Sequence, residues 1–273
     1  MEKILRVGIL QFESSGDKLK NVERILTLAK RVEADIVVLP EYSMLNIAGR
    51  SPVEVYEASE AVDGPYISEF KKFARENSTY VLVTLLERAT YPKVYNTAVV
   101  ISPDEKIVTI YRKIHLFDAL GVRESDYMTP GDKPGSIFDV KGAKLTIAIC
   151  FDLRFPELFR YYGLQGAEVV LVPSAWYSGP MKEEVIRFLA RARASENTYY
   201  VVVANQYSTR FTGRSMVIDP LGTVLLDLGL GEKYVEFDID VSYVYQVRKS
   251  LPLLELRRND IYTLSFCNRS GLA

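Results

Sequence analysis

Short runs of almost entirely apolar residues recur along this chain and alternate with segments of helical periodicity, which restricts the fold more than any other feature of the sequence. Residues 35–39 (DIVVL) and 145–149 (LTIAI) are two such runs. Strands with this composition are covered on both faces, as they are when helices flank a parallel sheet. Residues 18–32 place apolar side chains at helical spacing. The pattern predicts an α/β fold with buried strands.

The alternation continues along the chain without a linker-like or low-complexity segment. We expect helices over residues 18–32, 65–77, 156–165 and 181–197. We expect strands over residues 6–12, 35–39, 80–86, 95–101, 106–111, 145–149, 169–172, 199–204, 215–218, 223–226 and 234–237. Turn-forming residues join some neighbouring strands into hairpins. We therefore expect one α/β domain over residues 1–273.

The charge and residue counts exclude several classes of function. Lys and Arg number 34 against 35 Asp and Glu, so no basic excess draws the chain to nucleic acid or to an anionic membrane. No apolar run approaches the roughly 20 residues that a membrane span needs. His115 is the one histidine, which excludes a metal site built on several histidines. Cys150 and Cys267 imply no disulfide framework, and we expect a cytoplasmic protein without a metal or other cofactor.

Three reactive side chains follow predicted strands at the point where each strand ends. Glu41 follows residues 35–39, Lys113 follows the strand that ends near residue 111, and Cys150 follows residues 145–149. In α/β sheets, ligand sites form beyond the carboxyl ends of strands. We therefore take Glu41, Lys113 and Cys150 as candidate catalytic residues.

These three groups would supply what a cysteine hydrolase needs. The thiolate is the nucleophile, and a carboxylate within reach can take the thiol proton. An ammonium stabilises the oxyanion of a tetrahedral intermediate, and the backbone N–H of Phe151 is a natural second donor. A helix that begins near Pro156 would add a modest positive dipole. Simpler roles remain open: Cys150 as buried packing, Glu41 as a turn cap and Lys113 as a solvated charge.

The motifs around these residues resemble those of the nitrilase, or carbon–nitrogen hydrolase, superfamily. VVLPEYS contains Glu41, YRKIHLFD contains Lys113, ICFDLRFPELFR contains Cys150 and RESDYMTPG contains Glu124; VPSAW, RARASEN and SMVIDPLG match later family segments. The resemblance covers essentially the whole chain. It implies a four-layer αββα sandwich that assembles into a homodimer or a larger homo-oligomer. It also implies Glu41 as base, Lys113 as stabiliser of the intermediate and Glu124 as the residue that positions substrate or Lys113. A plain surface charge is the alternative for Glu124.

Within the superfamily, CFDLRFPEL is most similar to the omega-amidase branch, whose members act on small amides that bear a carboxylate. Nitrile-cleaving members usually have Trp-Glu after the cysteine, where this chain has Phe151 and Asp152. We expect Phe151, Arg154, Trp176 and Tyr177 to contact the substrate. Arg154, with Arg123 or Tyr177, could receive the carboxylate. An ion pair of Arg154 with Asp152 or Glu157 is an equal alternative, and Trp176 could instead lie in the core or at a subunit contact.

One segment departs from the branch. Branch members usually carry His-Trp-Glu after Gly-Pro, whereas residues 180–187 read PMKEEVIR here. Because this segment borders the pocket in relatives, the resemblance does not fix the specificity. The leading interpretation is a cysteine-dependent amidase that forms a thioester and releases ammonia. A nitrilase, an N-carbamoyl hydrolase and a non-catalytic binding partner remain alternatives.

Overall fold

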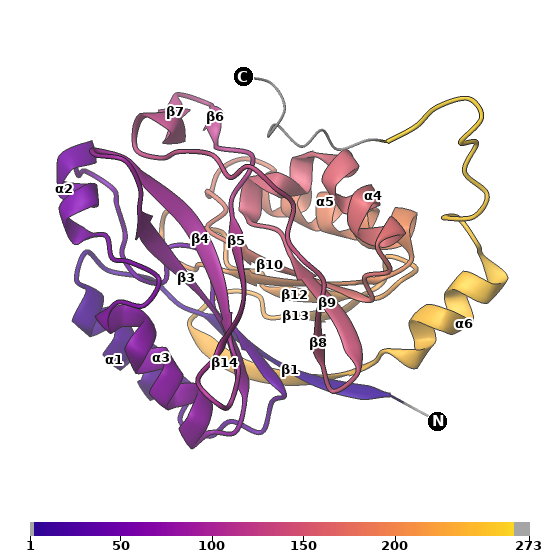
Figure 1. The fold of residues 1–273 in the computed structure, drawn as a ribbon, viewed down its shortest axis with the longest axis horizontal. Coiled ribbons are helices and arrows are strands. Elements are labelled where there is room, and N and C mark those ends of the chain that lie inside the picture. The colour runs from indigo at the N-terminus through magenta and orange to yellow at the C-terminus, as the bar shows by residue number, and fades with distance from the viewer. Residues whose placement is uncertain (1–2, 265–273) are drawn as a thin grey trace.

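The strands form two six-stranded sheets that lie face to face in the computed structural model, which describes residues 3–264 (Figure 1). The first sheet has the order β14 (Lys233–Asp240), β1 (Ile4–Gln11), β2 (Ile36–Val38), β3 (Tyr80–Arg88), β4 (Val94–Ile101), β5 (Ile107–Arg112). The second has the order β13 (Val224–Asp227), β12 (Met216–Ile218), β11 (Tyr200–Asn205), β10 (Val169–Ser174), β9 (Ala143–Ile147), β8 (Phe138–Val140).

Helices cover the outer faces of both sheets. On the first sheet these are α1 (Lys18–Leu28), α2 (Pro52–Ala58) and α3 (Pro65–Glu76). On the second they are α4 (Pro156–Leu164) and α5 (Lys182–Asn197). The expected four-layer αββα sandwich is thereby confirmed. Shorter elements complete the chain: the β6 (Asp118–Ala119) and β7 (Val122–Arg123) hairpin, the 3-10 turns η1 (Glu124–Asp126) and η2 (Cys150–Arg154), and α6 (Ser242–Ser250).

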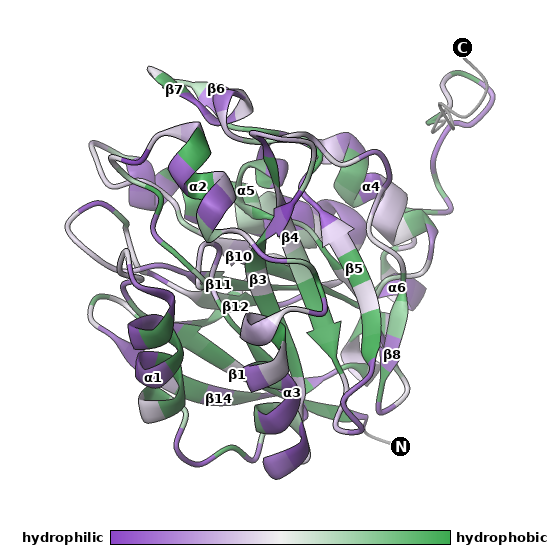
Figure 2. Cartoon of the chain, turned by 60° about the vertical axis from the view of Figure 1, so that its left-hand side comes forward, coloured by the Kyte–Doolittle hydropathy of each residue, from purple (hydrophilic) through white to green (hydrophobic). Residues whose placement is uncertain are grey.

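The alternation of side chains along each strand explains why the apolar runs have no polar face. In β2, Ile36 and Val38 pack in the core between the two sheets, whereas Val37 packs in a second core beneath the helices. Successive side chains of a strand point to opposite faces, so a strand between two apolar layers must be apolar throughout. Figure 2 shows strands of this interior as largely hydrophobic and the outer helices as mixed.

The strand directions bring several strand ends to one edge of the sandwich. In the first sheet β2 runs parallel to β1 and β3. Strand β4 is antiparallel to both β3 and β5, so β5 points in the same direction as β3. In the second sheet β9, β10 and β11 are parallel to one another. Because carboxyl ends of parallel strands meet at one edge, the loops after these strands are neighbours. The loops that carry Glu41, Lys113 and Cys150 are among them.

The structure corrects some expected elements. The first helix ends at Leu28, not at Val32. Val32 lies in the following loop but packs against the same core, so its apolar character does not depend on a helix. The short helix α2 was not expected, although Ser51 and Glu54 form a capping box at its start. Strand β8 and helix α6 were also missed. Cys267, the second of the two cysteines, lies outside the described residues.

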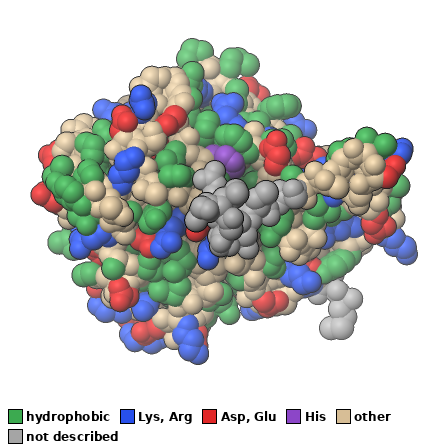
Figure 3. All heavy atoms as spheres, turned by 45° about the horizontal axis from the view of Figure 1, so that its top comes forward, with side chains coloured by type: hydrophobic (Ala, Val, Ile, Leu, Met, Phe, Trp, Pro, Cys, Tyr) green, Lys and Arg blue, Asp and Glu red, His purple; other side chains and the backbone are tan. Residues whose placement is uncertain are grey.

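Surface features of the described chain agree with the sequence composition. Figure 3 shows acidic and basic side chains interspersed on one face, and the histidine side chain reaches the surface there. None of the helices within residues 3–264 is long and apolar enough to cross a membrane.

Candidate active site

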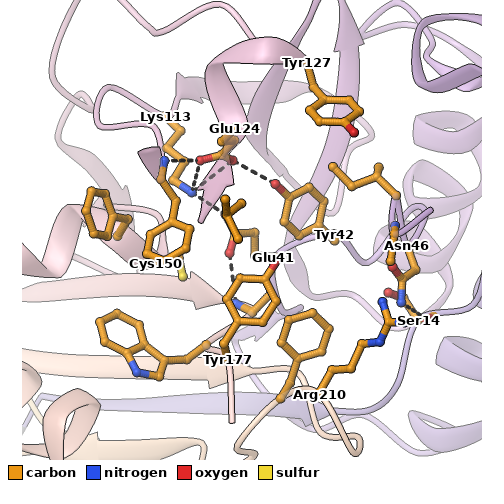
Figure 4. A pocket seen from close by; sticks show the side chains of 18 of the residues that line it. Ser14, Glu41, Tyr42, Asn46, Lys113, Glu124, Tyr127, Cys150, Tyr177 and Arg210 are labelled. Carbon is orange, nitrogen blue, oxygen red and sulfur yellow. Dashed lines mark hydrogen bonds and ion pairs between the residues drawn. The ribbon is translucent and has the colours of Figure 1, made fainter. Parts of the chain in front are cut away.

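The side chains of Glu41, Lys113, Glu124 and Cys150 line one pocket at the edge where the strands end (Figure 4). The cavity has a volume of about 180 Å³, which admits a small molecule. All four side chains are buried, although each could ionise. The structure thus brings together the four residues that the sequence marked as catalytic candidates.

The Glu41 carboxylate is held by donors from both sheets. Its Oε1 accepts hydrogen bonds from Lys113 Nζ at 2.8 Å and from Asn96 Nδ2 at 2.7 Å. Its Oε2 accepts one from the backbone N–H of Ala175 at 2.9 Å. Gln206 Nε2 also donates to the Glu41 carbonyl at 2.8 Å. These contacts fix the carboxylate in one orientation, so Glu41 does more than cap a turn.

Lys113 lies between two carboxylates. Besides its bond to Glu41, its Nζ donates to Glu124 Oε2 at 2.9 Å and to Glu124 Oε1 at 3.1 Å. The side chain of Lys113 is only 2% exposed, which excludes the alternative of a solvated charge. The hydrogen bonds of the ammonium thus go to Glu41 and Glu124, which hold it at the floor of the pocket.

Glu124 belongs to the interior of the site and not to a surface loop. It lies in the turn η1 and is 5% exposed. Its Oε1 also accepts from Tyr42 Oη at 2.8 Å, and its Oε2 accepts from the backbone N–H of Phe117 at 2.6 Å. These fixed donors leave Glu124 bound to the protein on every side, as suits a residue that positions Lys113.

Cys150 begins the turn η2 with a left-handed backbone conformation, φ +45°. This conformation is unfavourable for a residue with a Cβ and persists only where the surroundings enforce it. The side chain is buried against the central core yet lines the pocket. A strained, sharply turned residue at a strand end is a common way to present a nucleophile to a cleft.

Asp152 is the residue that enforces this turn, and the sequence did not mark it. It is fully buried, and its Oδ2 accepts from the backbone N–H of Ile149 at 2.8 Å and from Tyr111 Oη at 2.7 Å. Its Oδ1 lies 2.7 Å from His115 Nδ1. The ring of His115 stacks on Phe155, with centroids 3.6 Å apart. Asp152 thus ties the Cys150 turn to the segment that carries Lys113, and His115 supports that turn through Asp152.

Burial and charge set the protonation of the pocket. Burial raises the pKa of Glu41, with the nearby Glu124 carboxylate adding to it and Lys113 opposing it. Burial also opposes ionisation of Glu124, but the Lys113 ammonium and the Phe117 N–H outweigh it and lower the Glu124 pKa. The two carboxylates likewise overcome desolvation and raise the pKa of Lys113. Both shifts favour the charged forms, so Lys113 and Glu124 form an ion pair.

The Cys150 thiol is neutral at rest. Burial and the Glu41 carboxylate raise the pKa of Cys150, and the Lys113 ammonium lowers it by less. Lys113 thus favours the thiolate, but burial and Glu41 outweigh it. A neutral thiol then lies beside a carboxylate of raised pKa, an arrangement suited to proton transfer between Cys150 and Glu41.

Aromatic side chains and an arginine form the outer walls of the pocket. The rings of Phe151 and Tyr177 pack near Phe117, at centroid distances of 4.9 and 5.8 Å. The Arg154 guanidinium lies over the rings of Trp176 and Phe151, at 5.2 and 5.9 Å. The alternative ion pairs of Arg154 with Asp152 or Glu157 do not form, since Arg154 has no ion-pair partner within residues 3–264.

The altered segment 180–187 reaches the pocket through a residue that the sequence did not mark. Met181 has a left-handed conformation, φ +60°, and helix α5 begins at Lys182. Lys182 lines the pocket, as do Arg123 and Arg210. Arg123 is largely exposed and lies 3.5 Å from Asp126. Arg210 comes from the loop after β11, a placement that no local sequence pattern signals.

The chain is similar to known proteins in sequence and in fold. A family model described as carbon–nitrogen hydrolase matches residues 6–249. The omega-amidase NIT2 of Mus musculus is 32% identical over 274 residues, which cover 95% of this chain and 97% of that protein. The deaminated glutathione amidase of Escherichia coli O157:H7 is 31% identical and covers 91% of this chain and 95% of its own length. The crystal structure of Saccharomyces cerevisiae Nit3, a member of branch 10 of the nitrilase superfamily, matches with a TM-score of 0.82 and 28% identity, over 94% of this chain and 97% of that one.

The electrostatics predict how Cys150 responds to removal of the Glu41 charge. Because that carboxylate raises the pKa of Cys150, Glu41→Gln should move the pH midpoint of Cys150 alkylation by iodoacetamide to lower pH. Peptide mass spectrometry would follow Cys150 separately from Cys267. Glu23→Gln, which removes an exposed carboxylate of α1 outside the pocket, should leave the midpoint unchanged. A midpoint that rises in Glu41→Gln would contradict the assignment.

Proposed function

The chain belongs to the carbon–nitrogen hydrolase family, and on that premise we propose that it is an amidase that hydrolyses small amides through a thioester on Cys150. The observation that carries the proposal is the contact of one ammonium, Lys113, with two carboxylates beside a buried, strained cysteine. No step needs a metal or an organic cofactor. Each of the four side chains has a distinct task.

In the first half-reaction, Cys150 Sγ attacks the amide carbonyl carbon while Glu41 accepts the thiol proton. Lys113 and the backbone N–H of Phe151 stabilise the oxyanion that develops on the carbonyl oxygen. Glu41 then gives its proton to the leaving nitrogen, the carbon–nitrogen bond breaks and ammonia departs. The raised pKa of Glu41 suits both transfers, since a base and acid works best when its pKa approaches the working pH.

In the second half-reaction, water attacks the thioester carbonyl and Glu41 takes a proton from that water. The thioester carbon–sulfur bond breaks, the proton returns to Cys150 and the carboxylic acid is released. Glu124 holds Lys113 in place throughout, because its lowered pKa keeps it ionised. Asp152 holds the turn of Cys150 in its unfavourable backbone conformation through the hydrogen bond from the Ile149 N–H.

The pocket walls favour short amides, and we assign Arg154 a contact with the substrate beside the turn of Cys150. Its guanidinium lies over the rings of Trp176 and Phe151 and has no acidic partner in the described chain. Phe151, Trp176 and Tyr177 would contact the aliphatic part of the substrate. A small amide as substrate agrees with the names of the relatives, omega-amidase and deaminated glutathione amidase.

We also propose that the protein is a cytoplasmic homodimer or a larger homo-oligomer. A reducing compartment keeps the Cys150 thiol free. Apolar side chains are exposed on the outer layer of the second sheet: Leu164 of α4, Phe188 of α5 and Leu221 are 40%, 68% and 49% exposed. A second copy that packs on this layer would cover them.

The function is tested by ammonia release from a panel of monoamides, N-carbamoyl amino acids and nitriles. The wild-type protein should release ammonia from monoamides, and Cys150→Ala should lower that rate at least about a thousandfold while retaining the circular dichroism spectrum of the fold. Release from nitriles alone, or of carbon dioxide with ammonia from carbamoyl compounds, would replace the amidase assignment. Undiminished release by Cys150→Ala would remove the mechanism.

The pH dependence follows from the raised pKa of Glu41. Below that pKa Glu41 is protonated and cannot accept the thiol proton, so kcat/KM should fall on the acid side with a midpoint above 4.5, the ordinary value for a glutamate. The measurement is kcat/KM against pH, with circular dichroism at each pH to separate it from unfolding. Full activity maintained through pH 4.5 would show that Glu41 is not the base.

A further inference from the structure

The charged groups of the pocket are unequally distributed between its floor and its mouth. On the floor, the carboxylates of Glu41 and Glu124 are both bound by Lys113. Around the mouth, the lining includes Lys182 and Arg210, of which Lys182 is half-buried and Arg210 exposed. No carboxylate other than those of the floor lines the pocket. The entrance is therefore positive.

Lys182 and Arg210 have no ion-pair partner in the part of the chain that the structure describes, residues 3–264. This contrasts with a neighbouring arginine, Arg214, which lies 3.2 Å from Glu183 and 3.5 Å from Asp227 outside the pocket. Glu183 follows Lys182 directly, yet its ion pair is with Arg214. Unpaired cations in a concave site attract an anionic ligand.

The backbone holds these two cations on one connected wall. The carbonyl of Arg210 accepts a hydrogen bond from the N–H of Ser178 at 2.7 Å, and Tyr177 pairs with Phe211 in an antiparallel bridge. The N–H of Lys182 donates to the Gly179 carbonyl at 3.1 Å. The loop of Arg210 and the start of α5 are therefore both tied to the segment from Tyr177 to Gly179.

The side chain of Arg210 extends toward Asn46 and Ser14, which lie on the opposite sheet's side of the pocket (Figure 4). The Asn46 amide donates to the Ser14 carbonyl at 3.3 Å, and the Ser14 hydroxyl accepts from Gln206 at 2.8 Å. These neighbours are neutral, so they leave the guanidinium charge uncompensated. Arg154, in contrast, lies beside the nucleophile turn and over the rings of Trp176 and Phe151.

We propose that Arg210 and Lys182 form an anion subsite at the pocket mouth, which binds a carboxylate at the end of the substrate remote from the scissile amide. The inference rests on the proposed amidase function and names residues that select its substrates. A guanidinium presents two parallel donors to a carboxylate, and the Lys182 ammonium adds a second charge. Segment 180–187, which departs from the branch pattern, thereby contributes to specificity through Lys182.

The test measures binding without turnover, in a Cys150→Ala background. Calorimetry compares glutaramate, which has one carboxylate and one amide, with its methyl ester, which is neutral and of nearly the same length. Arg210→Gln should weaken the affinity for glutaramate about tenfold or more, the loss expected for a hydrogen bond to a charged group. Lys182→Gln should also weaken the affinity for glutaramate. Binding of the ester should not change. Arg210→Lys, which keeps the charge, should retain most of the affinity.

Arg31→Gln is the matched control, because it removes an exposed arginine charge outside the pocket. It should leave both affinities unchanged. Equal loss for glutaramate and its ester in Arg210→Gln would show a structural effect and overturn the subsite. A wild-type site without preference for the carboxylate ligand would overturn it as well.

Ammonia release from the two ligands by the protein with Cys150 intact separates this inference from the proposed function. Release from both, without a carboxylate preference in binding, contradicts the subsite and supports the amidase. A carboxylate preference that depends on Arg210, without ammonia release from either ligand, supports the subsite and contradicts the amidase.

Discussion

The contact of the Lys113 ammonium with Glu41 and Glu124 is the interaction on which the rest of the site depends. Three charges are buried together, and each would be costly alone. Lys113 stabilises both carboxylates, but they differ in their other contacts. Glu124 is saturated by fixed donors and stays ionised, whereas burial and the charge of Glu124 make Glu41 easier to protonate. Two glutamates bound by the same ammonium thus differ in role: Glu124 stays an anion, and Glu41 accepts a proton.

The sandwich is what allows these charges to be buried. Glu41 and Lys113 follow strands of the first sheet, and Cys150 follows β9 of the second, so the site exists only where the two sheets meet. Donors from the second sheet's side, the Ala175 N–H and the Gln206 amide, complete the surroundings of Glu41. The packing between the sheets is therefore also the device that aligns base and nucleophile.

The sequence predicts the catalytic candidates better than it predicts their supports. Glu41, Lys113 and Cys150 stand at the ends of apolar strands, a local pattern that is visible without a structure. Asp152, which holds the Cys150 turn, is itself bound by Tyr111 and His115, which lie 41 and 37 residues away along the chain. Arg210 reaches the pocket only because its loop pairs with the segment at Tyr177. Such contacts arise from long-range packing, which local periodicity does not encode.

Rapid-quench mass spectrometry of the protein during turnover of a monoamide shows whether an acyl group forms on Cys150. If the buried thiol is the nucleophile, a fraction of the quenched protein will carry the mass of the substrate less ammonia, and peptide mapping will place that acyl group on Cys150. An acyl group mapped to any other residue, or turnover with no covalent adduct at any quench time, would contradict the account.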